Sequence, residues 1–175
     1  MSVGSCHDRS SELELEHVVS QGSFGKIYRG RYKATSCMVA AKVVPESAEV
    51  RNEIFFLSKC SSSFTVGYFG SFLSGSERWV ITDYCHGGLV SDLVTKFGSN
   101  GSFPEPCIRA VCAGVLAGLD FLHSIDVCHR DIRCRSVLLT NAGESATLDW
   151  YFSCAQSRHF HCDWSCTRIC QVDWI

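Results

Sequence analysis

The chain has 175 residues, of which 46% are hydrophobic and 19% charged, a composition typical of one folded globular domain. Its formal net charge of -2 offers no basic surface, so we expect no nucleic-acid partner and no attraction to an anionic membrane. No long uncharged apolar run predicts membrane insertion, and the polar, acidic first residues do not resemble a secretory signal.

Twelve cysteines are unusual for this length and allow two interpretations. In a secreted chain they would predict a disulfide framework, whereas without a secretory signal we expect reduced thiols and a cytoplasmic location. Many lie among apolar residues, where cysteine behaves as a small hydrophobic residue. We expect this of Cys37, Cys60, Cys107 and Cys112.

The first third of the chain predicts a meander of β-strands followed by a helix. Residues 1–14 form a polar leader, and short β-type runs separated by glycine-containing turns extend from about Leu15 to Val44. Between Glu49 and Leu57 the apolar residues recur at the spacing of one helix face.

The rest of the chain to residue 149 predicts two strands, two helices and a small hairpin. The strands are expected at 66–73 and 78–84, the helices at 90–97 and 104–123, and the hairpin arms at 136–140 and 146–148. The longer helix carries a broad apolar stripe. Its members are Ile108, Val111, Cys112, Val115, Leu116, Leu119 and Leu122.

Two features of the first third of the chain are candidates for a functional site. The glycines of residues 22–25 would let backbone amides approach phosphate oxygens, although a plain hairpin turn would use the same residues. Lys42 lies in an apolar strand, where a charged group needs a partner. Glu53 is the expected partner and Glu49 the alternative; a lysine at a strand edge that reaches solvent is the other interpretation.

Two later features complete a pattern. His129-Arg130-Asp131 precedes a short apolar strand, and Asp149 ends the next one. Each feature alone could be ordinary loop polarity. Together and in this order they match the protein kinase signature, which consists of a glycine turn, a strand lysine, a helix glutamate and two aspartates. Residues 53–60, 66–72, 79–85 and 88–92 further resemble the Ste20 group, especially its MST/Hippo-like branch.

The resemblance implies an α+β fold with two lobes. The N-terminal lobe, about residues 15–85, would hold a small antiparallel sheet and one helix, and residues 86–149 would form an incomplete helical C-terminal lobe. It also implies ATP-dependent phosphorylation of protein serine or threonine, with ATP and Mg²⁺ as cofactors. A protein substrate or a regulatory protein would be the partner.

The resemblance also implies a role for each matching residue. Asp131 would be the catalytic base, Lys42 would hold the phosphates, Glu53 would orient Lys42, and Arg133 would assist. The expected ATP-binding positions are Ser20, Gly22, Gly25, Ile27, Ala40, Lys42, Thr82, Asp83, Cys85, Asp92 and Leu138. The expected metal ligands are Asp149 and, weakly, Ser136.

Several positions depart from the family pattern. Ser20 replaces the first loop glycine, and Arg133 replaces a lysine without its compact ammonium shape. Ser136 replaces the metal-binding asparagine with a shorter, weaker ligand. Asp149-Trp150-Tyr151 replaces Asp-Phe-Gly and loses the backbone freedom of the glycine.

The segment after Asp149 is the largest departure. We recognise no activation loop or later helices in residues 150–175, which form a Cys/His-rich tail, so we expect a truncated domain with impaired phosphoryl transfer. The alternatives are a non-catalytic, pseudokinase-like fragment that binds nucleotide or a partner, and a truncated gene product with no stable role. Zinc binding by His159, Cys162, Cys166 and Cys170 is a further alternative for this tail.

Overall fold

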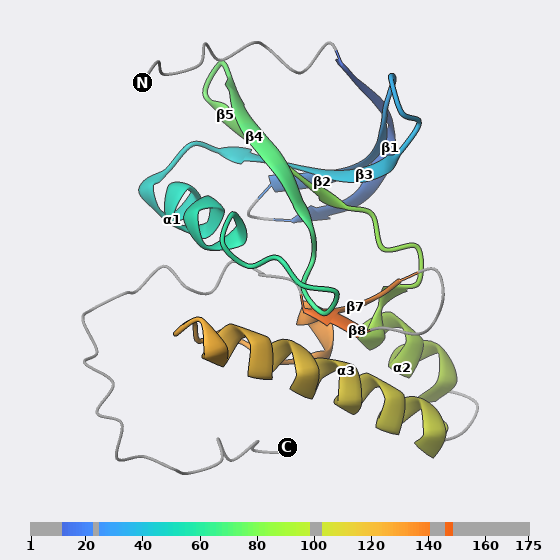
Figure 1. The fold of residues 1–175 in the computed structure, drawn as a ribbon. Coiled ribbons are helices and arrows are strands. Elements are labelled where there is room, and N and C mark those ends of the chain that lie inside the picture. The colour runs from blue at the N-terminus through green and yellow to red at the C-terminus, as the bar shows by residue number, and fades with distance from the viewer. Residues whose placement is uncertain (1–11, 23–24, 99–102, 141–145, 149–175) are drawn as a thin grey trace.

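The computed structural model describes residues 12–22, 25–98, 103–140 and 146–148. These residues form a β-rich lobe that carries one helix and a second lobe dominated by two helices (Figure 1). The expected α+β fold is confirmed, including a small antiparallel sheet and one helix in the first lobe.

The N-terminal lobe is built on a five-stranded sheet in which every neighbouring pair is antiparallel and the spatial order is β1-β2-β3-β5-β4. The first strand begins two residues earlier than expected, because Leu13 is buried in the sheet's core. The strands are β1 (Leu13–Gly22), β2 (Gly25–Tyr32), β3 (Met38–Pro45), β4 (Tyr68–Ser74) and β5 (Glu77–Asp83).

Helix α1 (Ala48–Leu57) follows β3 after a two-residue connection. It begins there because the Ser47 hydroxyl accepts a hydrogen bond from the backbone N–H of Val50 at 3.3 Å, which is the usual N-cap arrangement. Val50 and Leu57 are its buried residues. The helix expected at Glu49–Leu57 is therefore confirmed to within one residue.

The second lobe contains α2 (Val90–Gly98), the long helix α3 (Glu105–Ser124) and a three-stranded sheet. Pro104 and Pro106 start α3, since proline is tolerated in the first turn of a helix. The strands are β6 (Gly88–Leu89), β7 (Val137–Leu139) and β8 (Ala146–Leu148), and the sequence did not predict the short β6. The 3₁₀ turn η2 (Cys134–Ser136) leads into β7.

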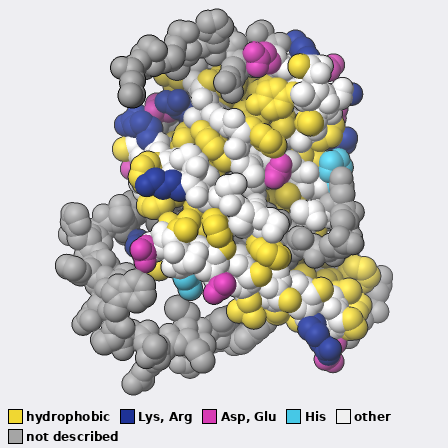
Figure 2. All heavy atoms as spheres, in the orientation of Figure 1, with side chains coloured by type: hydrophobic (Ala, Val, Ile, Leu, Met, Phe, Trp, Pro, Cys, Tyr) yellow, Lys and Arg dark blue, Asp and Glu magenta, His cyan; other side chains and the backbone are white. Residues whose placement is uncertain are grey.

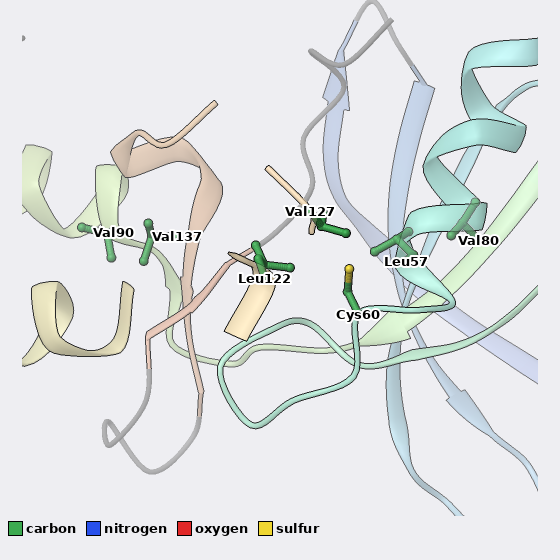
Figure 3. Close-up of a cluster of buried hydrophobic side chains, with 7 residues drawn as sticks. All are labelled: Leu57, Cys60, Val80, Val90, Leu122, Val127 and Val137. Carbon is green, nitrogen blue, oxygen red and sulfur yellow. The ribbon is translucent and has the colours of Figure 1, made fainter. Parts of the chain in front are cut away.

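One hydrophobic cluster joins the two lobes (Figure 3). Leu57 and Val80 come from α1 and β5 of the N-terminal lobe, whereas Leu122 and Val137 come from α3 and β7 of the other lobe. The remaining members are Cys60, Val90 and Val127. Because close-packed interiors resist rearrangement, this cluster fixes the faces that the two lobes present to each other.

The apolar stripe of α3 divides into a buried and an exposed part. Leu122 is fully buried, and Val111, Val115 and Leu119 pack against the cluster between the lobes. Leu116 is 65% exposed, and Ile108 and Cys112 are also exposed. Figure 2 shows hydrophobic side chains gathered at the end of the molecule where α2 and α3 lie.

The length and apolar composition of α3 would also suffice to cross a membrane. The segment is not the long uncharged apolar run whose absence was noted, because it contains Glu105, Arg109 and Asp120. A core helix passes the same test, and Gly114, Gly118 and Leu122 of α3 are buried within the domain.

The described cysteines form no disulfide, and their expected reduced state stays a prediction. Only Cys60 among them is buried, and burial raises the pKa of its thiol. Cys37, Cys107 and Cys112 are exposed, although apolar residues neighbour them in the sequence. Apolar neighbours along the sequence did not predict burial, because the helix turns Cys107 and Cys112 away from the core.

Candidate active site

The alternation of β3 separates a core face from a second face of the sheet. Val39, Ala41 and Val43 are buried, whereas Ala40 and Lys42 between them are half-buried. Successive side chains of a strand point to opposite faces, so Ala40 and Lys42 lie together on the face opposite the core.

Strand register brings other expected nucleotide-binding residues to this face. Ile27 of β2 lies directly opposite Lys42, and Thr82 of β5 lies opposite Ala40. Ser20 of β1 in turn lies opposite Ile27. Directly opposed residues of antiparallel strands share a face, so residues far apart in the sequence form one continuous surface.

The predicted pairing of Lys42 with Glu53 is confirmed. The ammonium nitrogen of Lys42 lies 2.8 Å from a carboxylate oxygen of Glu53, and their side chains are only 17% and 12% exposed. Glu49, the alternative partner, is exposed near the start of α1, where a hydrogen bond from the Ser47 side chain lowers its pKa. This short ion pair, which is largely shielded from solvent, fixes the position of the lysine ammonium group on the sheet face.

The glycine-rich turn is described at its two ends. Gly22 and Gly25 lie opposite each other in the β1–β2 register, and the residues between them are outside the described part of the chain. Gly25 has a φ of 130°, which L side chains rarely adopt. A Cβ atom at Gly25 would also collide with the backbone carbonyl of Val43, so β2 passes very close to β3 here.

The segment joining the lobes is held at both ends by hydrogen bonds. The carboxylate of Asp83 accepts a hydrogen bond from the backbone N–H of Gly67 at 2.9 Å, and the backbone N–H of Asp83 donates to the carbonyl of Gly67. At the other end, the N–H of Gly87 donates to the carbonyl of Leu139 at 2.9 Å. Residues 83–85, expected to bind adenine through their backbone, therefore lie between two fixed points.

The other expected nucleotide-binding residues lie on the second lobe or near it. Cys85 is partly buried, and Leu138 of β7 is also partly buried and pairs with Leu89 of β6. Asp92 is exposed in the first turn of α2, where its carboxylate lies 3.4 Å from the hydroxyl of Ser91.

Asp131 lies in a constrained loop. Its carboxylate is 2.9 Å from a guanidinium nitrogen of Arg133, and its backbone N–H donates to Nδ1 of the buried His129 at 3.3 Å. Arg130 has a φ of 66°, which is uncommon for a residue other than glycine. Strained conformations of this kind cluster at functional sites, where surrounding contacts hold them in place.

Ser136 is fully buried and bonded to the same loop. Its hydroxyl lies 2.7 Å from the carbonyl oxygen of Asp131 and 2.9 Å from that of Arg133, so its single proton is held by the loop backbone. The oxygen also accepts a hydrogen bond from the N–H of Arg133 at 3.0 Å. The loop backbone thus already engages the hydroxyl, and the weak metal-binding role expected of Ser136 stays a prediction.

The expected metal ligands can be located only in part. The other expected ligand, Asp149, lies outside the described residues, as do Trp150 and Tyr151. Residues 12–22, 25–98, 103–140 and 146–148 contain no group of three or more His, Cys, Asp or Glu side chains arranged to hold a metal ion. The Cys/His-rich tail also lies outside the described part.

Sequence reasoning missed a charged cluster beside this site. The carboxylate of Glu46, between β3 and α1, binds Arg78 of β5 and Arg51 of α1. No local signal identified Glu46, because a polar residue after a proline at the end of a strand is typical of any loop.

The five-stranded sheet, the paired Lys42 and Glu53 and the strained loop at Asp131 together define a protein kinase domain. A family model described as "protein kinase domain" matches residues 13–171, so the chain belongs to this family. The match runs past residue 149, where we expected the kinase-like part to end; that boundary stays a prediction.

Its relatives are Ste20-type kinases, as the sequence predicted. The chain is 35% identical over 146 residues to serine/threonine-protein kinase 4 homolog B of Dictyostelium discoideum, covering 82% of this chain and 13% of the relative. It is 34% identical over 162 residues to Misshapen-like kinase 1 of Rattus norvegicus, covering 86% and 12%. Serine/threonine-protein kinase 1 of Arabidopsis thaliana is 35% identical over 143 residues, with 78% and 17% covered. The chain thus spans only about an eighth to a sixth of these relatives.

Proposed function

We propose that this domain binds ATP on the sheet face that carries Lys42. The observation that carries the proposal is the 2.8 Å pair of Lys42 and Glu53, which aims a lysine ammonium group at the place where phosphates would lie. Ile27, Ala40 and Leu138 would contact the adenine ring, and the backbone of residues 83–85 would provide its hydrogen bonds. Thr82 would lie behind the ring and Asp92 near the ribose.

The reaction that this site supports best is phosphoryl transfer to a serine or threonine hydroxyl of a protein. Asp131 would accept the hydrogen bond of the substrate hydroxyl and so orient it toward the phosphate. The guanidinium group of Arg133, already 2.9 Å from Asp131, would supply positive charge beside the transferring group. A protein substrate is therefore the expected partner, and a cytoplasmic location stays a prediction.

The divalent metal used by the family would neutralise phosphate charge when bound. Asp149 is the expected ligand in this chain, and we propose that Ser136 is not one, because its hydroxyl is occupied by the loop backbone. The same observation favours a second candidate function, a non-catalytic module that binds nucleotide without efficient transfer.

A nucleotide titration tests the proposal. The melting temperature of the wild type should rise with ATP, and Lys42→Met should weaken the response about tenfold or more in ATP concentration, because a charge-assisted contact is lost. Equal responses of the two proteins would contradict ATP binding through Lys42. A radiolabel transfer assay with Asp131→Asn then separates the two functions: transfer that needs Asp131 indicates a kinase, and binding without transfer indicates the non-catalytic module.

A further inference from the structure

Glu46 occupies the corner where three elements of the N-terminal lobe meet. Its carboxylate binds Arg78 of β5 through two contacts, at 2.6 Å to Nε and 3.0 Å to Nη2. A guanidinium nitrogen of Arg51, on α1, lies 2.7 Å from the same carboxylate. The backbone N–H of Glu46 also donates to the carbonyl of Ser76 at 3.0 Å, in the turn between β4 and β5.

These contacts hold the start of α1 against the sheet. Glu46 immediately precedes Ser47, the N-cap of the helix, and Arg51 lies in its first turns. Arg78 belongs to the sheet itself, where it lies opposite Val44 of β3. One carboxylate thus connects the helix and the sheet, and its side chain is only 19% exposed.

Apolar contacts also hold helix α1, because Leu57 belongs to the cluster between the lobes and Ile54 and Phe56 pack against that cluster. Only Val50 and Leu57 of its ten residues are buried. A helix advances about 100° per residue, so Arg51 and Glu53 point to nearly opposite sides of α1. A contact that fixes Arg51 therefore also fixes the direction in which Glu53 points.

We propose that Glu46 is a positioning residue for the nucleotide site, because it clamps α1 to the sheet so that Glu53 faces Lys42. The effect of Glu46 on ATP binding rests on the proposed function, whereas the clamp between α1 and the sheet does not. The carboxylate is held as an anion, because the hydrogen bond from Arg78 and then that from Arg51 lower the pKa of Glu46 to about 2. The clamp is therefore closed throughout the physiological pH range.

Hydrogen exchange of the ligand-free chain tests the clamp directly. Glu46→Gln keeps the shape of the side chain and removes its charge, so the amides of Ala48–Leu57 should exchange about tenfold faster. Acylation of Lys42 should also become faster, because its partner is no longer held in place. Glu105→Gln is the matched control, since it breaks an ion pair of 2.9 Å between side chains that are 81% and 78% exposed, on α3. It should change neither measurement.

A second variant and a nucleotide measurement complete the test. Arg51→Gln removes only the helix side of the clamp and serves if Glu46→Gln does not fold; it should also speed exchange in α1. Unchanged exchange in α1 would overturn the clamp, whatever the ATP result.

ATP binding provides the second measurement. If the wild type binds ATP, Glu46→Gln should weaken the affinity about fivefold to tenfold, but it should not weaken the affinity further in a Lys42→Met background. Equal losses in both backgrounds would also overturn the positioning role. A wild type that binds no ATP would contradict the proposed function, while the exchange measurement would still decide the clamp.

Discussion

The hydroxyl oxygen of Ser136 lies 2.7 Å from the backbone carbonyl oxygen of Asp131. Ser136 has no exposed surface, so water cannot replace this contact. The hydroxyl also accepts the N–H of Arg133, which places one small side chain at the centre of the loop that carries two expected catalytic residues. The loop therefore depends on Ser136 for its shape.

Ser136→Ala should destabilise the domain by about 1–3 kcal/mol, because the N–H of Arg133 and the carbonyl of Asp131 would lose a buried partner. Urea denaturation of the two proteins measures this difference. Ser124→Ala is the control. The exposed hydroxyl of Ser124 donates to the carbonyl of Phe121, and water can take its place as the donor after the substitution. Equal losses for the two variants would contradict the central place of Ser136.

Gly25 and Gly22 form a second matched pair. Gly25→Ala should cost at least about 2 kcal/mol, because a φ of 130° strains an alanine and its Cβ would come within 2.7 Å of Val44 Cγ1. A Cβ at Gly22 would meet nothing within 4 Å, so Gly22→Ala should change stability by less than about 1 kcal/mol. Thermal and urea melts compare the two. A costly Gly22→Ala beside a neutral Gly25→Ala would reverse this account of the turn.

Glu46 predicts a dependence of stability on pH. Its bonds with Arg78 and Arg51 lower its pKa from 4.5 to about 2. A lowered pKa means that the folded state favours the carboxylate, so the contribution is complete above pH 4.5 and is lost as the pH falls toward 2. We expect about 1–2 kcal/mol, less than the full shift implies, because Arg51 is 60% exposed and screened by solvent.

The difference in unfolding free energy between the wild type and Glu46→Gln isolates this contribution from the other carboxylates. It should be constant from pH 7 to about pH 5 and should shrink steadily below pH 4.5. A difference that stays constant down to pH 3 would show that Glu46 has an ordinary pKa.

Most elements of the fold followed from local patterns in the sequence. Alternation and glycine turns predicted the strands, and the spacing of Val50 and Leu57 predicted α1, because both patterns report which side of an element is buried. The short β6 was missed, since two residues carry no period. The exposure of Cys107 and Cys112 could not be predicted from their apolar neighbours, because neighbours along the chain do not say which way a helix faces.

The site was predictable where motif spacing alone determines contact. Lys42 and Glu53 were paired correctly, since a half-buried lysine needs a partner and the next helix offers one. The role of Ser136 could not be predicted, because its hydroxyl bonds depend on the exact path of the loop. The Glu46–Arg78 contact joins residues 32 apart through the fold of the sheet, which no local pattern encodes.

Leu122 and Leu116 allow the stability cost of the same substitution to be compared at a buried and an exposed position of α3. Leu122 is completely buried in the cluster between the lobes, whereas Leu116 is 65% exposed. Leu122→Ala should cost about 2–5 kcal/mol through lost burial and the cavity it leaves, and Leu116→Ala less than about 0.5 kcal/mol. The gain in helix propensity is the same for both, so it cancels in the comparison. Urea denaturation at fixed protein concentration measures both values. If Leu116→Ala lowers the free energy of unfolding as much as Leu122→Ala, this face of α3 is covered in solution. A repeat at tenfold higher protein concentration would then show whether a second copy of the chain covers it.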